Sequence, residues 1–212
     1  MKNNFILIYI ILHSSVSFSQ KEKTICKSFK KLSRPEKCWI IVHPFIAKKV
    51  WKISVHTNEI STQIKNDSVL DGDISGGQVD AFRHAFWMAS LCQKINWRKA
   101  RKLGIAHEKG NKIDFKKGKK EDEFLPDSVS VEMDLFNNKI GILLGKQFKN
   151  YSEKELISVV KKSILSGEMK IIKKDSKGNS LDENNEIISD WIGKWNSRRI
   201  LVSSDYQRKK ED

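Results

Sequence analysis

Residues 79–95, with the sequence VDAFRHAFWMASLCQKI, decide the fold of this chain. Phe82, Ala85, Phe86 and Ala89 recur at intervals of three and four residues, so they share one broad face of a helix. Most of the remaining side chains in the stretch are apolar as well. The stretch therefore predicts a long apolar helix, and the few polar groups within it need a separate explanation.

The same helical periodicity appears in four other parts of the chain, at residues 44–64, 97–109, 129–148 and 153–166. Ser75 and Gln78 have the spacing of a capping box, which predicts the start of the apolar helix shortly afterwards. Gly110 is typical of a C-cap and predicts the end of the helix that precedes it. Gly141 and Gly145 are four residues apart, which predicts that another backbone approaches their helix closely.

The pattern changes after Gly167. Residues 169–172 are rich in β-forming side chains and residues 175–178 form a turn signal, so we expect a small hairpin. The expected fold class is mainly α, a compact helical bundle of about five or six helices with a small C-terminal β-hairpin. The expected organisation is a signal peptide at 1–19, a polar lead-in at 20–39, a helical domain at 40–175 and a partly frayed C-terminal extension at 176–212.

The composition is that of a basic globular protein. The chain has 212 residues, a formal net charge of +14 and 39% hydrophobic residues, which is enough to build a core. Only 11 Gly and 3 Pro exclude collagen-like and turn-dense β architectures, and 3 Cys are too few for a disulfide-stapled miniprotein.

The first nineteen residues have the pattern of a signal peptide, because a lysine precedes a short apolar run and small residues follow it. We therefore expect an exported protein, periplasmic or secreted, with no transmembrane anchor after cleavage. In such an oxidising compartment we expect a disulfide between Cys26 and Cys38. Cys92 lies in the apolar helix and is expected to be a buried thiol.

Polar side chains occur on three successive predicted helices. The first helix carries Asp80 and His84 at i, i+4 spacing, the second ends with His107 and Glu108, and the third carries Asp134, Asn137 and Asn138. Such groups are costly on apolar helices unless their hydrogen bonds are satisfied. Because facing helices of a bundle can bring polar groups together, the pattern predicts one site between these helices.

A metal centre is one chemistry that fits this set. Its ligands would be His84, His107 and Asp134, and a mixed nitrogen and oxygen set suits a divalent Zn, Mn or Fe ion. The second His of a helical zinc-protease motif is absent after His107 and Glu108, and the sequence contains no Gly-rich phosphate loop and no Gly-x-Ser-x-Gly elbow. Those classes are excluded.

A metal-free hydrolytic site fits equally well. His84 would act as a base oriented by Asp80, and Glu108 and Asn138 would complete the catalytic set. Two further residues, Arg83 and Asn137, are candidates for binding the substrate. The open alternative is that these residues form a buried network whose only task is to fix helix packing.

Positive charge is concentrated between residues 94 and 120, where eleven Lys or Arg and two acids give a local net charge of +9. Such a patch attracts anionic lipid, phosphoesters or acidic glycans. It lacks the interleaved aromatic residues of a single-strand nucleic-acid platform, so nucleic acid is not favoured as a partner. A solvated surface is the simpler interpretation of the same charge.

The motif residues also resemble a known family. The segments DAFRHAxW from Asp80, AHE from Ala106 and MDxxNNxxG from Met133 resemble a bacterial domain family of unknown function, over roughly residues 40–175. The resemblance covers Asp80, Arg83, His84, His107, Glu108, Asp134, Asn137 and Asn138. Membership would imply an exported protein and would not name an activity.

The sequence thus supports two main functional hypotheses. The first is an exported hydrolase that acts on an anionic substrate, such as a phospholipid or another phosphoester, through a His/Asp/Glu/Asn site between helices. The second is a non-catalytic secreted helical module whose buried polar network is structural. A toxin-like effector differs from the first hypothesis only in its target.

Overall fold

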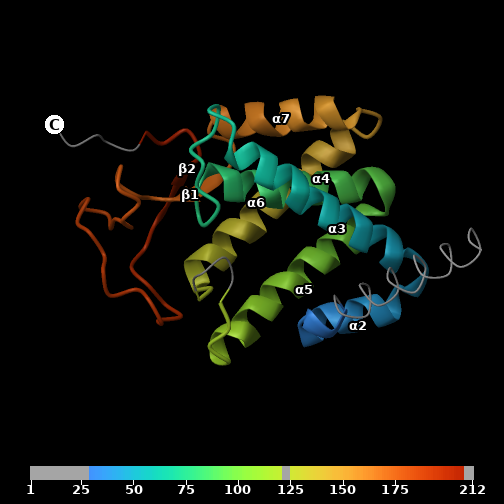
Figure 1. Ribbon diagram of the computed structural model, residues 1–212, viewed down its shortest axis with the longest axis horizontal. Helices are drawn as coiled ribbons and strands as arrows, with labels where there is room; N and C mark the ends of the chain where they lie inside the picture. Colours follow the sequence, from blue (N-terminus) through green and yellow to red (C-terminus); the bar gives the residue numbers. More distant parts are fainter. Residues whose placement is uncertain (1–28, 121–124, 208–212) are drawn as a thin grey trace, which may run out of the picture.

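The computed structural model describes residues 29–120 and 125–207 (Figure 1). Its elements in chain order are α2 (Arg34–Val42), α3 (Pro44–Lys65), α4 (Gln78–Lys94), α5 (Trp97–Lys116), α6 (Ser128–Gln147), α7 (Glu153–Leu165), β1 (Lys170–Ile172) and β2 (Leu201–Ser203). The expected fold class, a helical bundle with a small antiparallel β-pair near the C-terminus, is confirmed. The predicted signal peptide and Cys26 lie outside the described residues.

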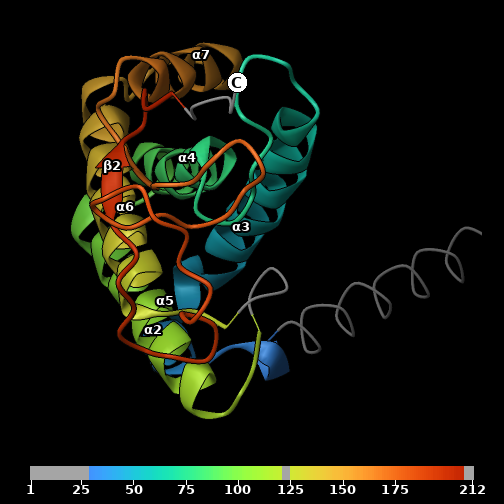
Figure 2. The ribbon, with the colours of Figure 1, turned by 90° about the vertical axis from the view of Figure 1, so that its left-hand side faces the viewer.

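Helix α4 is the centre of the bundle. Figure 2 shows α4 in the middle, with α3, α6 and α7 around it. Its apolar side chains are almost fully buried in all directions, and the rings of Phe82 and Phe86 stack with their centroids 5.3 Å apart. A helix that is apolar on most of its surface is stable only when other elements enclose it, which explains why residues 79–95 carry so little polarity.

Two glycines allow α6 to approach α4 closely. A Cβ atom on Gly141 would lie 2.2 Å from the carbonyl oxygen of Ala85, and one on Gly145 would lie 2.5 Å from that of Ala89. Alanines on α4 face glycines on α6, so the two backbones pack with almost no side chain between them. The close approach predicted from the glycine spacing is confirmed.

The start of α4 differs from the prediction. Its N-cap is Gly77, which makes no side-chain cap, so the capping box expected from Ser75 and Gln78 is wrong. The carboxylate of Asp71 accepts a hydrogen bond from the backbone N–H of Gln78, at 3.0 Å from each oxygen. An acid from the preceding loop thus satisfies the helix end.

The end of α5 also differs. The helix continues to Lys116, so the predicted C-cap at Gly110 is wrong and the charged loop that follows is shorter than expected. A Cβ atom on Gly110 would lie 2.4 Å from the hydroxyl oxygen of Ser33, the N-cap residue of α2. The glycine is needed for contact with α2 and not for a turn.

The β-pair joins distant parts of the chain. Strand β1 pairs antiparallel with β2, with Lys170 opposite Ser203. The predicted turn is present, since the carboxylate of Asp175 accepts hydrogen bonds from the backbone N–H groups of Lys177 and Asn179, but the strand partner of β1 lies well beyond it. Both β2 and the buried Arg199, which pairs with Asp127 at the start of α6, belong to the C-terminal extension.

None of the described helices combines the length and the apolar character that crossing a membrane requires. Cys92 is buried in α4 as a thiol, as expected, and burial raises its pKa to about 11, although the nearby Lys146 opposes the shift. The exposed Cys38 lies in α2.

The close packing of α4 and α6 leads to a first prediction. Gly141→Ala is expected to destabilise the protein by about 3 kcal/mol, because its methyl group would collide with backbone atoms of α4 that cannot move aside. Gly104→Ala is the matched control within α5, since its Cβ would meet only side-chain atoms at 3.3 Å or more. The free energy of unfolding of the Gly104→Ala variant, measured with urea, should stay within about 1 kcal/mol of wild type. Equal losses in both variants would contradict the proposed packing constraint.

Candidate functional site

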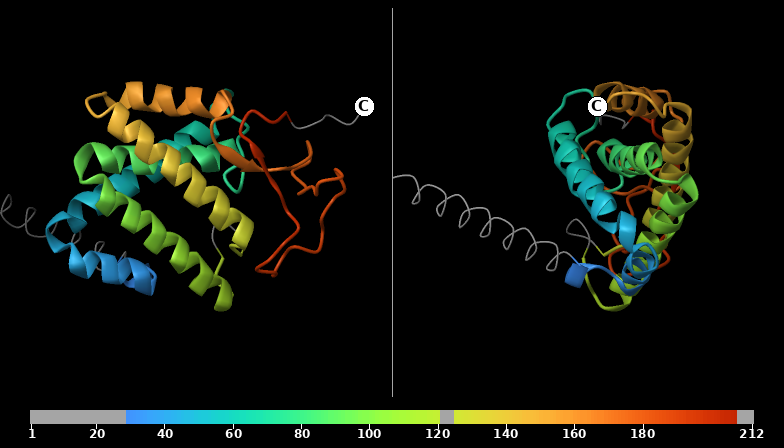
Figure 3. Two further views of the ribbon diagram at one scale, coloured as in Figure 1. Left: turned by 180° about the vertical axis from the view of Figure 1, so that it is seen from behind. Right: turned by 90° about the vertical axis from the view of Figure 1, so that its right-hand side faces the viewer.

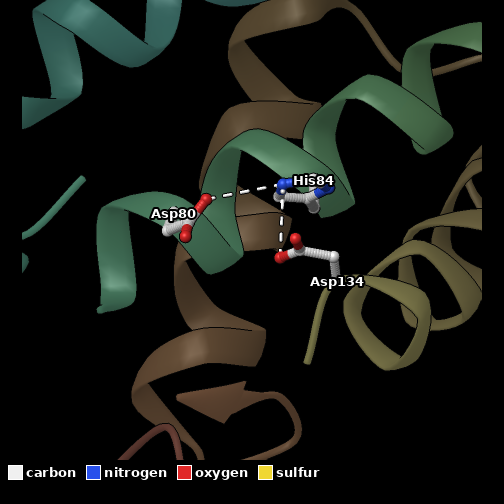
Figure 4. Close-up of side chains that lie close together, drawn as sticks. All are labelled: Asp80, His84 and Asp134. Carbon is white, nitrogen blue, oxygen red and sulfur yellow. Dashed lines mark ion pairs between the residues drawn. The ribbon is translucent and has the colours of Figure 1, made fainter. Parts of the chain in front are cut away.

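Three buried ionisable side chains from two helices meet at the α4–α6 contact (Figure 4). The Nε2 atom of His84 lies 3.5 Å from Oδ1 of Asp80 and 3.3 Å from Oδ1 of Asp134. All three residues are at most 5% exposed, and one candidate ligand atom from each lies within 4.8 Å of the others. A single imidazole nitrogen therefore faces two carboxylates.

Local structure explains this convergence. Asp80 and His84 are one helical turn apart on α4 and so point the same way. Asp134 lies on α6 two turns before Gly141, which packs against Ala85, the neighbour of His84. The glycine contact that brings the two backbones together thus also places Asp134 beside the imidazole.

Asp80 is held through both of its carboxylate oxygens. Oδ2 accepts a hydrogen bond from the backbone N–H of Gly76 at 2.7 Å, and Oδ1 accepts one from the guanidinium of Arg83 at 2.7 Å. The loop before α4 and the helix itself thus fix this acid. Arg83 also brings a positive charge next to the Asp80 carboxylate, which offsets part of the cost of burying it.

Glu108 and Asn138 lie on the other side of the imidazole. Oε1 of Glu108 is 4.0 Å from Nδ1 of His84 and accepts a hydrogen bond of 3.4 Å from the side-chain amide of Asn138. Oε2 accepts another, of 3.0 Å, from Asn111. Of the two predicted catalytic residues, Glu108 therefore lies near the second ring nitrogen of His84, and Asn138 joins the cluster through Glu108.

His107 does not join the predicted ligand set. Its Nδ1 lies 3.0 Å from Oε1 of Glu36 in α2, and its ring centroid is 6.3 Å from that of His84. The group that could hold a metal contains Asp80 instead, together with His84 and Asp134. His107 as a metal ligand therefore stays a prediction, and in this structure its Nδ1 is engaged by Glu36 of α2.

Asn137 is used to hold the β-pair. Its side-chain amide donates to the carbonyl oxygen of Lys170 and accepts from the backbone N–H of the same residue, both at 2.9 Å. The residue is fully buried. The predicted role in substrate binding finds no support in this position, because both ends of the amide already serve β1.

A cavity of about 310 Å³ reaches His84 from the side of α2 and α3, which is within the usual range of small-molecule sites. Its wall combines apolar side chains, such as Val50 and Trp87, with the polar groups of Arg83 and His107. A second, much smaller space of about 30 Å³ touches Asp80 and Asp134 and is large enough for a water molecule.

The cavity wall contains two groups that sequence reasoning missed. The indole N–H of Trp51 and the hydroxyl of Thr57, both on α3, are buried and make no hydrogen bond within the described part of the chain. In the sequence both residues lie on an ordinary amphipathic helix, so no local signal marks them. Their unsatisfied polar atoms are consistent with a cavity that holds water or a ligand.

The contact of His107 with α2 has a measurable consequence. Burial alone would raise the pKa of Glu36, but the hydrogen bond and charge of His107, together with Ser33, lower it below its ordinary value. The folded protein therefore binds fewer protons at this site than the unfolded chain does. The stabilisation by Glu36 is complete above the unfolded pKa and is lost as the pH falls through the folded pKa.

We therefore predict that Glu36→Gln lowers the free energy of unfolding at neutral pH by about 1 kcal/mol, and that the difference from wild type is lost as the pH falls through the lowered pKa of Glu36. Urea unfolding of wild type and variant, from neutral to acidic pH, measures this difference in free energy. Glu132→Gln, at an exposed position of α6, is the control and should change little at any pH. A difference for Glu36→Gln that is equally large at low pH would contradict the assigned ion pair.

Comparison with known proteins places this site in a family. No curated protein and no solved structure matches the chain significantly. A family model described as a domain of unknown function, DUF6973, matches residues 37–168, which contain all of the site residues described above except Glu36. Because this match spans more than half of the chain, the protein belongs to the DUF6973 family.

Proposed function

We propose that the protein is a hydrolase whose centre is formed by Asp80, His84 and Asp134, and that its substrate is an anionic ester with an apolar part, such as a phospholipid or another phosphoester. One observation carries the proposal. A single imidazole nitrogen faces two buried carboxylates, and His84 itself lines a cavity large enough for a small molecule, whereas Asp80 and Asp134 line the smaller space.

The donor set fits a divalent cation. One imidazole nitrogen and two carboxylate oxygens, all buried and within 4.8 Å of one another, suit Zn, Mn or Fe. Such an ion would supply Lewis-acid activation of an ester oxygen or of the attacking water. With Nε2 of His84 as a ligand, Nδ1 would carry the ring proton and face Glu108, the usual arrangement in which an acid orients a liganding imidazole.

The remaining residues have roles in orienting the site. Arg83 holds Asp80 and also lines the cavity, so it is placed to attract the negative charge of a substrate. The apolar part of the substrate would lie against Val50, Trp87 and Leu103. In a site without metal, the same imidazole would act as a general base, since Asp80 and Asp134 can stabilise the positive charge that it gains.

The proposal places this hydrolase outside the cytoplasm. This proposed location rests on the pattern of residues 1–19, which have a lysine, a short apolar run and small residues near the expected cleavage site. A secreted enzyme would meet lipids and phosphoesters outside the cell.

A structural role is the competing proposal, and one observation favours it. Glu108 already accepts hydrogen bonds from Asn111 and Asn138, and Asn137 binds β1, so part of the polar set is used in packing. Under this alternative the whole cluster would fix the register of α4, α5 and α6 and carry no chemistry.

Elemental analysis and hydrolysis assays distinguish the hydrolase from the structural network. The purified protein is expected to contain close to one equivalent of Zn, Mn or Fe, and His84→Gln should lose it because the only nitrogen ligand of the cluster is removed. Hydrolysis of bis-p-nitrophenyl phosphate and dioctanoyl phosphatidylglycerol should fall about 100-fold or more in the variant. His56→Gln is the matched control, since His56 also contacts two carboxylates but is half exposed.

Three results would count against the proposal. Metal without hydrolysis of either ester would overturn the hydrolase and leave the metal site. Hydrolysis that His84→Gln leaves intact would place the activity elsewhere. Neither metal nor hydrolysis, with His84→Gln folded but less stable by about 1–3 kcal/mol, would establish the structural network.

A further inference from the structure

A long groove runs between α5 and α6 on a face of the bundle. The two helices lie side by side in the left view of Figure 3, and the groove between them has a volume of about 890 Å³. Its floor and walls are largely apolar, formed by residues such as Met88, Ile105 and Val131. Leu135 and Leu143 stand at its edge and are 39% and 50% exposed.

The rim of this groove is strongly basic. Five exposed cations line it: Arg101, Lys109, Lys112, Lys139 and Lys146. Among the described residues that line it, the only acid is Glu108, which is 3% exposed and accepts hydrogen bonds from Asn111 and Asn138. Among the described lining residues, the groove therefore presents apolar surface surrounded by positive charge that no exposed acid offsets.

Two indole rings, Trp97 and Trp195, also line the groove. The ammonium group of Lys146 lies 4.9 Å from the ring centroid of Trp97, and that of Lys112 lies 5.4 Å from the ring centroid of Trp195. Tryptophan is favoured where an apolar region meets a polar one, because its ring is largely apolar and its N–H is polar. The cation–π contacts keep the lysines close to the apolar surface.

We propose that this groove binds an anionic phospholipid, with its acyl chains on the apolar floor and its phosphate among the rim cations. Charge complementarity selects this occupant. A second copy of the chain would bring the same positive rim against itself, and the chain's own apolar run at residues 5–12 contains no acid. A small free anion would bind the rim cations but would leave the apolar floor of the groove uncovered.

The lipid groove is distinct from the cavity at His84. Helix α5 separates them, since Leu103 and His107 line the cavity whereas Gly104 and Glu108 line the groove. The inference rests on the groove alone and does not depend on the proposed hydrolase activity.

Calorimetric titration with short-chain lipids tests it. The probe is ether-linked dihexyl phosphatidylglycerol, used as monomers and checked by mass spectrometry to remain intact. We expect saturable binding of this lipid. The phosphatidylcholine analogue should bind at least about tenfold more weakly, because it lacks the net negative charge of the head group. Glycerol phosphate should not bind, because it lacks the chains. Binding should be the same in the His84→Gln background, so that failure of lipid binding and failure of hydrolysis are separate results.

Matched variants locate the site. Lys139→Glu/Lys146→Glu should weaken binding about tenfold or more, whereas Lys154→Glu/Lys162→Glu, an equal charge change on α7, should not. Leu135→Ser/Leu143→Ser should weaken it also, whereas Val69→Ser/Leu165→Ser, at similarly exposed apolar positions, should not.

The proposal is overturned by any of four results. These are no saturable binding of the phosphatidylglycerol, equal binding of glycerol phosphate, equal effects of the groove and control variants, or self-association of the wild type that the groove variants abolish.

Discussion

The burial of α4 is the constraint on which the rest of the structure depends. This helix is enclosed by its neighbours, and its residues have to be small, apolar or compensated. Asp80 and His84 break that rule. Asp80 is bound by the Gly76 N–H and by Arg83 of α4 itself, and His84 lies beside Asp134 and Glu108 of the neighbouring helices. The site is therefore a property of the packing, and a change in the α4–α6 distance would alter both stability and the geometry of the Asp80, His84 and Asp134 cluster.

Much of the fold could be predicted from sequence, because hydrophobic periodicity is a local property. Periodicity located α3, α4, α6 and α7 closely, and the spacing of Gly141 and Gly145 predicted a close helix contact. Gly110 was misinterpreted because a C-cap glycine and a contact glycine look alike locally. Only Ser33, which reaches α5 from a distant part of the chain, distinguishes them.

The candidate site was predictable only in part, for the same reason. Asp80 and His84 share a helical face by spacing, and that pairing is present in the structure. The position of the His107 ring depends also on Glu36, which belongs to α2 and is far from His107 in the sequence. Asn137 and Asn138 are adjacent but point differently, so one binds β1 and the other binds Glu108. Spacing along one helix does not contain that information.

The cavity is what distinguishes a working site from a structural network. A buried polar group without a partner costs about 1–3 kcal/mol, so a network that served packing alone would close around its members. Here the indole N–H of Trp51 and the hydroxyl of Thr57 are buried without hydrogen-bond partners in the described chain, and both residues line the same cavity as His84. Neither atom has appreciable accessible surface, so bound water or a substrate would reach them only after a small shift of these side chains. The two atoms thus show that this wall leaves polar groups unsatisfied, unlike a closed packing network, and they do so independently of the arrangement of Asp80, His84 and Asp134.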